Sequence, residues 1–232
     1  DYDLSVEFYW SPFLVQLDKY QANGTKILRL DQLEASSMHW QGADIMVFNT
    51  GHWWVHRGKL RAWDMFHYEG KLVEEMKIES ALDMAMKAWA YWIDNNVDST
   101  KTTVFFRSIS PEHKGKHWCY NETKPITDES HEESFPRPLM DIVERTIRGM
   151  RMPVRFLNIT KLSQYRRDAH TSIFRTRAGK ELIEKKQKQA KSFADCSHWC
   201  LPGLPDTWNR LMYADMILHS SKICAGLPHV VV

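Results

Sequence analysis

The sequence has no long apolar run, no excess of charge of one sign and few cysteines. No stretch approaches the roughly 18 consecutive apolar residues that a membrane-spanning helix needs. The 31 basic and 29 acidic residues leave a formal net charge of +2, so composition does not argue for a nucleic acid or an anionic membrane surface as a partner. The chain has 232 residues, of which 43% are apolar and 12% are aromatic. This length is sufficient for one large globular domain.

The first residues also lack the features of a secretion signal. They carry no basic flank, no apolar stretch and no initiator Met. The chain begins just before the aromatic run Phe8-Tyr9-Trp10. We therefore expect the sequence to be a piece of a longer protein.

Four cysteines and three Asn-x-Ser/Thr triplets bear on the compartment. The triplets begin at Asn23, Asn121 and Asn158, although only about one would be expected by chance from seven asparagines. This excess favours glycosylation in the secretory pathway. Disulfides in that pathway and buried thiols in a reducing compartment both remain open for the cysteines, which are Cys119, Cys196, Cys200 and Cys224.

The segment from Asp195 to Cys200 places a carboxylate three residues before an imidazole. On a tight turn or in the first turn of a helix, residues i and i+3 share a face. Asp195 then accepts a hydrogen bond from one nitrogen of His198 and leaves the other nitrogen to take a proton from a serine. Two alternatives are a structural ion pair at a helix start and a zinc site made of Asp195, Cys196, His198 and Cys200.

Short apolar runs alternate with helical patterns, which predicts an α/β fold with a mainly parallel sheet. Residues 43–48 and 102–107 each predict a buried strand. Between them, residues 78–93 predict a helix whose apolar side chains recur at i, i+3 and i+4, namely Leu82, Ala85, Met86, Trp89 and Ile93. Together these elements predict a right-handed strand–helix–strand unit.

The second half continues this alternation. The long polar stretch over residues 108–137 predicts a functional or pinned loop. Residues 138–150 predict a helix, residues 154–159 a third strand and residues 206–219 a closing helix. The charged run over residues 180–191 has a helical pattern and predicts a solvated surface segment. No repeat appears, so a single domain over residues 1–232 suffices.

Two candidate site residues follow the predicted strands. Ligands of parallel α/β sheets lie beyond the carboxyl ends of the strands, which is where Asn49 and Arg107 fall. The Asn49 amide suits donation to an oxyanion, or an Asx-turn that shapes the loop. Arg107 suits a substrate carboxylate or carbonyl, or an ion pair at the edge of the core. We expect structural roles for the histidines His113, His117 and His170.

The ten tryptophans are unusual for this length. Most tryptophans fill cores, but their faces also stack on sugar rings. Three of them, Trp53, Trp54 and Trp199, flank the candidate reactive residues. This placement favours a carbohydrate-lined cleft, with core packing as the alternative.

Five blocks, in this order, carry a family resemblance: residues 6–14 (VEFYWSPFL), 48–54 (FNTGHWW), 105–113 (FFRSISPEH), 167–170 (RDAH) and 195–209 (DCSHWCLPGLPDTWN). They span nearly the whole chain, and the last block alone is highly specific. The sequence resembles the plant trichome birefringence-like family of polysaccharide O-acetyltransferases, which are related to the SGNH/GDSL esterases. The resemblance implies an SGNH-hydrolase-like three-layer sandwich, here a PC-esterase domain that is incomplete at its N-terminus.

The resemblance also implies a mechanism. A serine in a Gly-Asp-Ser motif takes an acetyl group from a donor, and the acyl-enzyme passes it to a sugar hydroxyl. His198 matches the family's general base and Asp195 its orienting acid, while Asn49 aligns with an oxyanion-hole Asn of the related esterases. The implied partners are a cell-wall polysaccharide and the acetyl donor, which is a substrate, so no cofactor is expected.

The family's setting is the lumen of the Golgi apparatus, where the full-length form is a type II membrane protein with an N-terminal anchor. In that setting the resemblance implies a disulfide between Cys119 and Cys196, no metal, and a partner for Cys200 in a segment outside this sequence.

No Gly-Asp-Ser motif occurs in the sequence. In the family this motif lies upstream of the block at residues 6–14, so we expect the serine to lie outside this chain and the chain alone to be inactive. One alternative is a non-catalytic glycan-binding or scaffold protein, and another is a hydrolytic carbohydrate esterase. Xylan, mannan, xyloglucan and pectin all stay open as acceptors.

Overall fold

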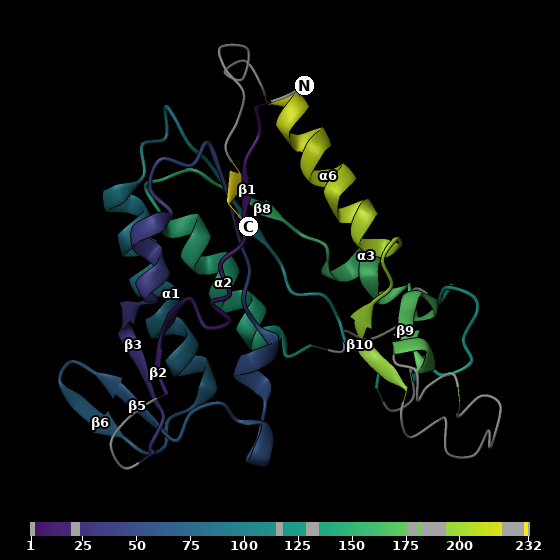
Figure 1. The fold of residues 1–232 in the computed structure, drawn as a ribbon, viewed down its shortest axis with the longest axis horizontal. Coiled ribbons are helices and arrows are strands. Elements are labelled where there is room, and N and C mark those ends of the chain that lie inside the picture. The colour runs from purple at the N-terminus through teal and green to yellow at the C-terminus, as the bar shows by residue number, and fades with distance from the viewer. Residues whose placement is uncertain are drawn as a thin grey trace. The chain divides into compact units, whose positions relative to one another are not determined.

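The structure, a computed structural model, describes residues 3–19, 24–114, 118–128, 135–175, 181, 194–219 and 230–231 (Figure 1). The chain forms two compact units that are interleaved along the sequence. The first unit comprises Asp1–Ile109, Arg137–Leu157 and Lys222–Val232, and the second comprises Ser110–Pro136 and Asn158–Ser221. The single domain over residues 1–232 stays a prediction.

A five-stranded parallel sheet lies in the first unit. Its strand order is β1 (Val6–Glu7), β11 (Val230–Val231), β4 (Ile45–Phe48), β7 (Thr103–Arg107) and β8 (Val154–Leu157). The side chains of β4 and β7 are mostly buried, as the strands of a parallel sheet require. The three predicted strands and the predicted α/β class are confirmed, and each strand is shorter than predicted at one end.

Two helices of the first unit confirm the predicted helical patterns. They are α1 (Ile78–Asn96) and α2 (Arg137–Gly149), which pack against each other. All five predicted stripe residues of α1 are buried, and α1 also lies against the second sheet of this unit at β3. Burial of one apolar stripe is the main source of stability for such helices.

The sequence patterns missed the second sheet of this unit. Its order is β2 (Val15–Asp18), β3 (Ile27–Leu33), β5 (Met65–Tyr68) and β6 (Lys71–Val73). A two-residue turn at Glu69 and Gly70, both with positive φ, joins β5 to β6 as a tight hairpin. The predicted strand–helix–strand unit is therefore interrupted, because β5 and β6 lie between β4 and α1.

The second unit contains α3 (Thr160–Gln164), β9 (His170–Ser172), β10 (Asp195–Trp199) and α6 (Leu204–Leu218). Strands β9 and β10 form a two-stranded antiparallel sheet. Helix α6 confirms the predicted closing helix, and Asp206 caps its start by accepting the Gly203 N–H at 2.7 Å. Its predicted apolar stripe is only partly buried, since Trp208 is 8% exposed but Leu211 is 38% exposed.

Several sequence predictions fall on residues that the structure does not describe. These are Asn23, His117, Cys224 and most of the charged run at 180–191. The described parts of residues 108–136 contain neither helix nor strand, in agreement with the predicted loop. Among the described helices, none combines the length and the apolar content that crossing a bilayer requires.

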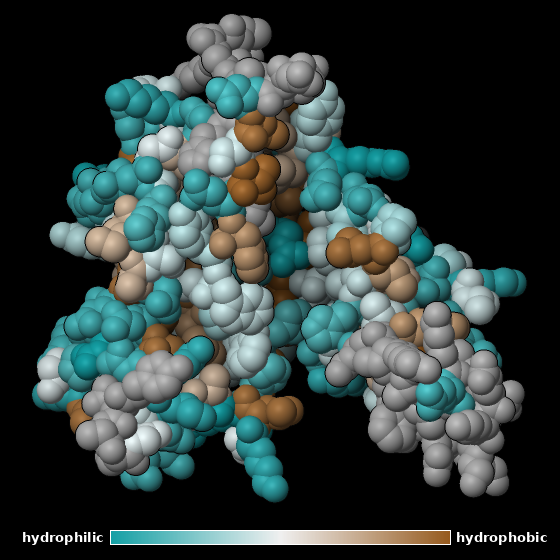
Figure 2. Space-filling model, in the orientation of Figure 1, coloured by the Kyte–Doolittle hydropathy of each residue, from teal (hydrophilic) through white to brown (hydrophobic). Residues whose placement is uncertain are grey.

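Apolar side chains gather on the surface over β1 (Figure 2). Leu4, Val6, Phe8 and Trp10 alternate along this segment and are 50%, 64%, 68% and 63% exposed. A spacing of two residues along an extended chain places these side chains on one face. The first unit therefore presents an apolar face at the edge of its parallel sheet.

Candidate active site

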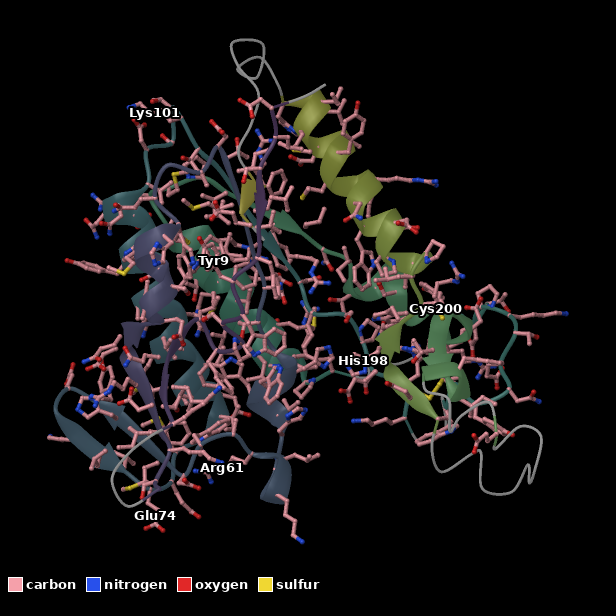
Figure 3. All side chains as sticks on the ribbon, in the orientation of Figure 1. Tyr9, Arg61, Glu74, Lys101, His198 and Cys200 are labelled. Atoms are coloured by element: carbon pink, nitrogen blue, oxygen red, sulfur yellow. A yellow bond between two sulfur atoms is a disulfide. The ribbon has the colours of Figure 1, made fainter. Side chains whose placement is uncertain are left out.

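Asp195 and His198 form the best-defined candidate site, and both lie on β10 in the second unit. His198 is labelled in Figure 3. Asp195 Oδ2 lies 2.8 Å from His198 Nδ1. Asp195 Oδ1 accepts the backbone N–H groups of Ser197 and His198, both at 3.0 Å. The Asp195 side chain is 4% exposed and the His198 side chain is 76% exposed. The acid is therefore buried and the imidazole faces solvent.

The predicted contact is present, but of the two settings predicted for it, a tight turn or the first turn of a helix, the helical one is wrong, because both residues lie on a strand. Asp195 pairs with Ser172 and Trp199 pairs with His170, so five residues of β10 lie opposite three residues of β9. The two extra residues form a bulge, which re-aims side chains that a regular strand would send to opposite faces. The bulge brings residues i and i+3 together in a strand, where the side-chain period of two would otherwise separate them.

This hydrogen bonding defines the tautomer of the His198 ring. A carboxylate only accepts hydrogen bonds, so Nδ1 carries the proton when the ring is neutral. The remaining nitrogen, Nε2, makes no hydrogen bond to another described residue. An imidazole held in this way presents an unprotonated Nε2 as a proton acceptor, and the buried carboxylate stabilises the imidazolium that forms when this nitrogen takes a proton.

A disulfide fastens β10 next to this pair. Cys119 and Cys196 are bonded, with a Cα–Cα distance of 5.5 Å, and this is the pair that the family resemblance implies. Because Cys196 is bonded in this disulfide, it is not available as a thiolate ligand for the alternative zinc site. Within the described residues, no group of three or more His, Cys, Asp or Glu side chains is arranged to hold a metal. Cys200, half-buried just after β10, is a free cysteine.

A cluster of rings that we predicted to be ordinary structure packs against β10. His113 and His170 are buried and lie in contact with each other and with Trp199. The signal that identifies them is in the sequence, because each is the last residue of a block that carries the family resemblance.

Asn49 and Arg107 lie at the same edge of the parallel sheet, as predicted. Phe48, the last residue of β4, pairs with Phe106 of β7. Asn49 directly follows β4, and Arg107 is the last residue of β7, so the two candidates lie at the same register position. Asn49 is exposed, whereas burial lowers the pKa of the Arg107 guanidinium to about 10. This pKa is still far above neutral, so Arg107 is a cation at physiological pH. The roles of both residues in a reaction stay predictions.

The predicted tryptophan-lined cleft needs a correction. Trp54 is 0% exposed, and its indole N–H donates to Thr50 Oγ1 at 2.9 Å, so it belongs to the core and has no face for a sugar. Trp53 is half-buried and packs edge-on against Trp10. Trp199, also half-buried, stacks on His170 with 3.9 Å between ring centroids. The cleft prediction is therefore wrong for Trp54 and stays a prediction for the other two tryptophans.

A small pocket lies beside Asn49 in the first unit. Its walls include Phe8, Tyr9, Trp10 and Trp40, and its volume is about 90 Å³. Ligand pockets usually measure roughly 300–1,000 Å³, so this pocket does not enclose a sugar ring. It does place the aromatic residues of the block at 6–14 next to Asn49, a juxtaposition that no pattern in the sequence indicates.

Gly51 allows the loop after β4 to approach the end of β7. Its φ is +151°, and a Cβ at this position would overlap the side chain of Ile109. We expect Gly51→Ala to lower the free energy of unfolding by about 1–3 kcal/mol, through strain and overpacking. Chemical denaturation measures this loss. The double variant Gly51→Ala/Ile109→Val removes the nearest side-chain atom and should recover part of it; equal losses in the two variants would contradict the clash.

An α/β protein with a parallel sheet and a paired Asp-x-x-His on a bulged strand has the features of a GDSL/SGNH-like acyl-esterase. Residues 1–215 match the PC-Esterase family, described as a GDSL/SGNH-like acyl-esterase family found in Pmr5 and Cas1p. The chain belongs to this family, and its predicted SGNH-like fold is confirmed.

Three curated relatives sharpen the assignment. The chain is 44% identical to protein trichome birefringence-like 1 and 40% identical to protein trichome birefringence, both from Arabidopsis thaliana, with 96% of the chain aligned to each. It is 38% identical to probable xylan O-acetyltransferase 8 from Oryza sativa subsp. japonica, with 93% of the chain aligned. The chain spans 41%, 38% and 52% of the lengths of these relatives. These similarities support the predicted trichome birefringence-like assignment.

Proposed function

We propose that this chain supplies the general base and the orienting acid of a cell-wall polysaccharide O-acetyltransferase. The observation that carries the proposal is the 2.8 Å hydrogen bond between buried Asp195 and exposed His198. The name of the rice relative supports acetyl transfer to a polysaccharide, and the family supports acyl chemistry. The acceptor is thus a polysaccharide, and the acetyl donor is the second substrate.

The proposed reaction uses a serine from outside these 232 residues. This part of the proposal rests on the absence of a Gly-Asp-Ser motif from the sequence. His198 Nε2 takes the proton of the serine hydroxyl as its oxygen attacks the acetyl carbonyl of the donor. The imidazolium then returns the proton to the leaving group, and an acetyl-serine ester remains.

The second half of the reaction reverses these roles. A sugar hydroxyl gives its proton to His198 Nε2 and attacks the acetyl-serine carbonyl, and the proton then returns to the serine oxygen. Asp195 stabilises each imidazolium that forms. We assign the Asn49 amide to the developing oxyanion and the Arg107 cation to substrate binding at the same sheet edge. Trp53 and Trp199 keep a proposed role in contacting the sugar.

The proposed setting is the Golgi lumen, with the longer protein anchored as a type II membrane protein. The disulfide supports an oxidising compartment. Two of the three glycosylation triplets fall in the described residues, and both acceptor asparagines, Asn121 and Asn158, are exposed. Exposure is what an attached glycan requires.

The proposal is tested with the longer protein that includes a Gly-Asp-Ser segment. Incubation with an activated acetyl ester should produce an acetyl-serine detectable by mass spectrometry, and xylan oligosaccharides should then be acetylated. His198→Ala should lower the rate by about 10²–10⁴-fold, because no group then takes the proton. An unchanged rate in this variant would exclude His198 as the base. Release of acetate with no acetylated sugar would instead identify a hydrolytic esterase.

A further inference from the structure

A buried pair of imidazole rings lies behind β10 in the second unit. His113 is 0% exposed and His170 is 4% exposed. Their rings approach edge to face, with 2.6 Å between His113 Nδ1 and His170 Nε2. Because two nitrogens at this distance repel each other unless a proton lies between them, the contact is a hydrogen bond.

The outer nitrogens of the two rings face backbone carbonyls. His113 Nε2 lies 2.7 Å from the Gln164 carbonyl oxygen, and His170 Nδ1 lies 2.9 Å from the His198 carbonyl oxygen. A carbonyl oxygen only accepts, so both outer nitrogens must carry a proton. The inner contact needs a third proton. Two neutral imidazoles carry only two protons between them, so the three contacts together require one extra proton and a charge of +1.

The surroundings suit a buried cation. Carboxylates act on His170 from three segments, namely Asp195 on β10, Glu112 beside His113 and Asp168 just before β9. The face of Trp199 stacks on His170, and aromatic faces stabilise cations. Burial lowers the pKa of His170 itself, against the opposing effect of its bond to the His198 carbonyl and of these carboxylates. The carboxylates and the face of Trp199 offset part of this cost of burial for the charged pair.

We infer that His113 and His170 share one extra proton and act as a positively charged clamp that positions the strand carrying Asp195 and His198. The clamp has two attachments to this strand. His170 Nδ1–H donates to the His198 carbonyl, and the backbone N–H of His113 donates to the Cys196 carbonyl at 2.9 Å. These are positioning residues, because they reach His198 only through its backbone.

The hold of the clamp on β10 weakens as the pH rises. When the pair holds its extra proton, all three hydrogen bonds exist. As pH rises and the pair loses this proton, the inner contact becomes repulsive, so the rings separate and the hold on β10 loosens. The positioning role rests on the proposed function of His198, whereas the proton count does not.

The proton count is tested on the unaltered 232-residue chain by NMR with ¹⁵N-labelled histidine. We expect a strongly deshielded proton bonded to one ring, with ¹⁵N–¹⁵N coupling across the hydrogen bond between His113 Nδ1 and His170 Nε2. Raising the pH should abolish the coupling. Two neutral rings without coupling, at every pH where the chain is folded, would overturn the proposal.

The positioning role is tested with His170→Asn, whose amide keeps a donor for the His198 carbonyl but has no counterpart of Nε2. In the parent chain, the protection of the β10 amides from hydrogen exchange should fall as the pH rises and the pair loses its extra proton. The measured rates are first corrected for the intrinsic effect of pH on exchange. In His170→Asn this pH-dependent step should disappear, and an unchanged step would refute the clamp. His219→Asn, at the exposed end of α6, is the matched control and should leave both the step and the coupling intact.

These measurements separate the two proposals. In the longer protein, His198→Ala should lower acetyl transfer by about 10²–10⁴-fold and retain the ¹⁵N–¹⁵N coupling. Coupling in a protein without acetyl transfer would support the shared proton and refute only the proposed function. Acetyl transfer in a protein without coupling would support the proposed function and refute the shared proton.

Discussion

Asp195→Asn is expected to lower the turnover of the longer, serine-containing protein by about 10⁴-fold, with little change in KM. The reason lies in the orientation that the backbone imposes on the new amide. The Ser197 and His198 N–H groups both donate to Oδ1 at 3.0 Å, so the amide oxygen must occupy that position. The amide NH₂ then replaces Oδ2, which lies 2.8 Å from His198 Nδ1.

An NH₂ group at that position reverses the tautomer of the imidazole. His198 Nδ1 must now accept, so the ring proton moves to Nε2, and this nitrogen no longer serves as a base. The side-chain volume and the backbone contacts stay nearly the same, which separates this effect from unfolding. Steady-state kinetics on an acetyl donor measures it, and ¹⁵N NMR of the His198 ring reports the tautomer.

A second Asp–His pair in the same unit provides the control. Asp215 lies on α6 and His219 directly follows this helix, with 3.6 Å between Asp215 Oδ1 and His219 Nδ1, and the His219 side chain is 58% exposed. Asp215→Asn should leave turnover unchanged, since this pair has no bulged strand and no buried carboxylate. Equal activity of Asp195→Asn and the parent protein would rule out the tautomer argument.

The elements that sequence patterns predicted are those whose burial produces a simple period. Strands β4 and β7 are nearly continuous apolar runs because their side chains are mostly buried on both faces of the parallel sheet. Helices α1 and α2 bury one stripe each, which leaves the 3.6-residue period visible. Strands β5 and β6 are short and only partly buried, and their identity depends on a hairpin turn rather than on a period.

In the candidate site, the sequence predicted the local contact but not the tertiary features around it. The i, i+3 spacing of Asp195 and His198 correctly predicted their contact, because local hydrogen bonding needs only local geometry. The strand that carries them was not predictable, since a bulge against β9 is a tertiary feature. Trp54 and the His113–His170 pair illustrate the same limit. Whether a ring fills a core or faces a ligand depends on neighbours from distant segments, such as Phe13 for Trp54 and Gln164 for His113.

The double variant Cys119→Ala/Cys196→Ala is expected to lower the free energy of unfolding of the second unit by about 4 kcal/mol. The disulfide joins residues 77 positions apart, and in the chain-entropy model a loop of this length gives a large constraint on the unfolded state. Typical domains are stable by only about 5–15 kcal/mol, so this loss is a large part of the total. Chemical denaturation followed by circular dichroism measures it, and reduction of the parent protein should give a similar loss.

The same cross-link bears on the active site, because Cys196 directly follows Asp195 and its carbonyl accepts the His113 N–H. Loss of the disulfide should therefore raise amide exchange on β10 more than on α1, which belongs to the other unit. Cys200→Ser is the matched control, since this free, half-buried cysteine lies four residues further along and makes no cross-link among the described residues. A double variant as stable as Cys200→Ser would show that the cross-link does not hold the second unit together. A stability loss spread equally over β10 and α1 would show that the two units unfold as one.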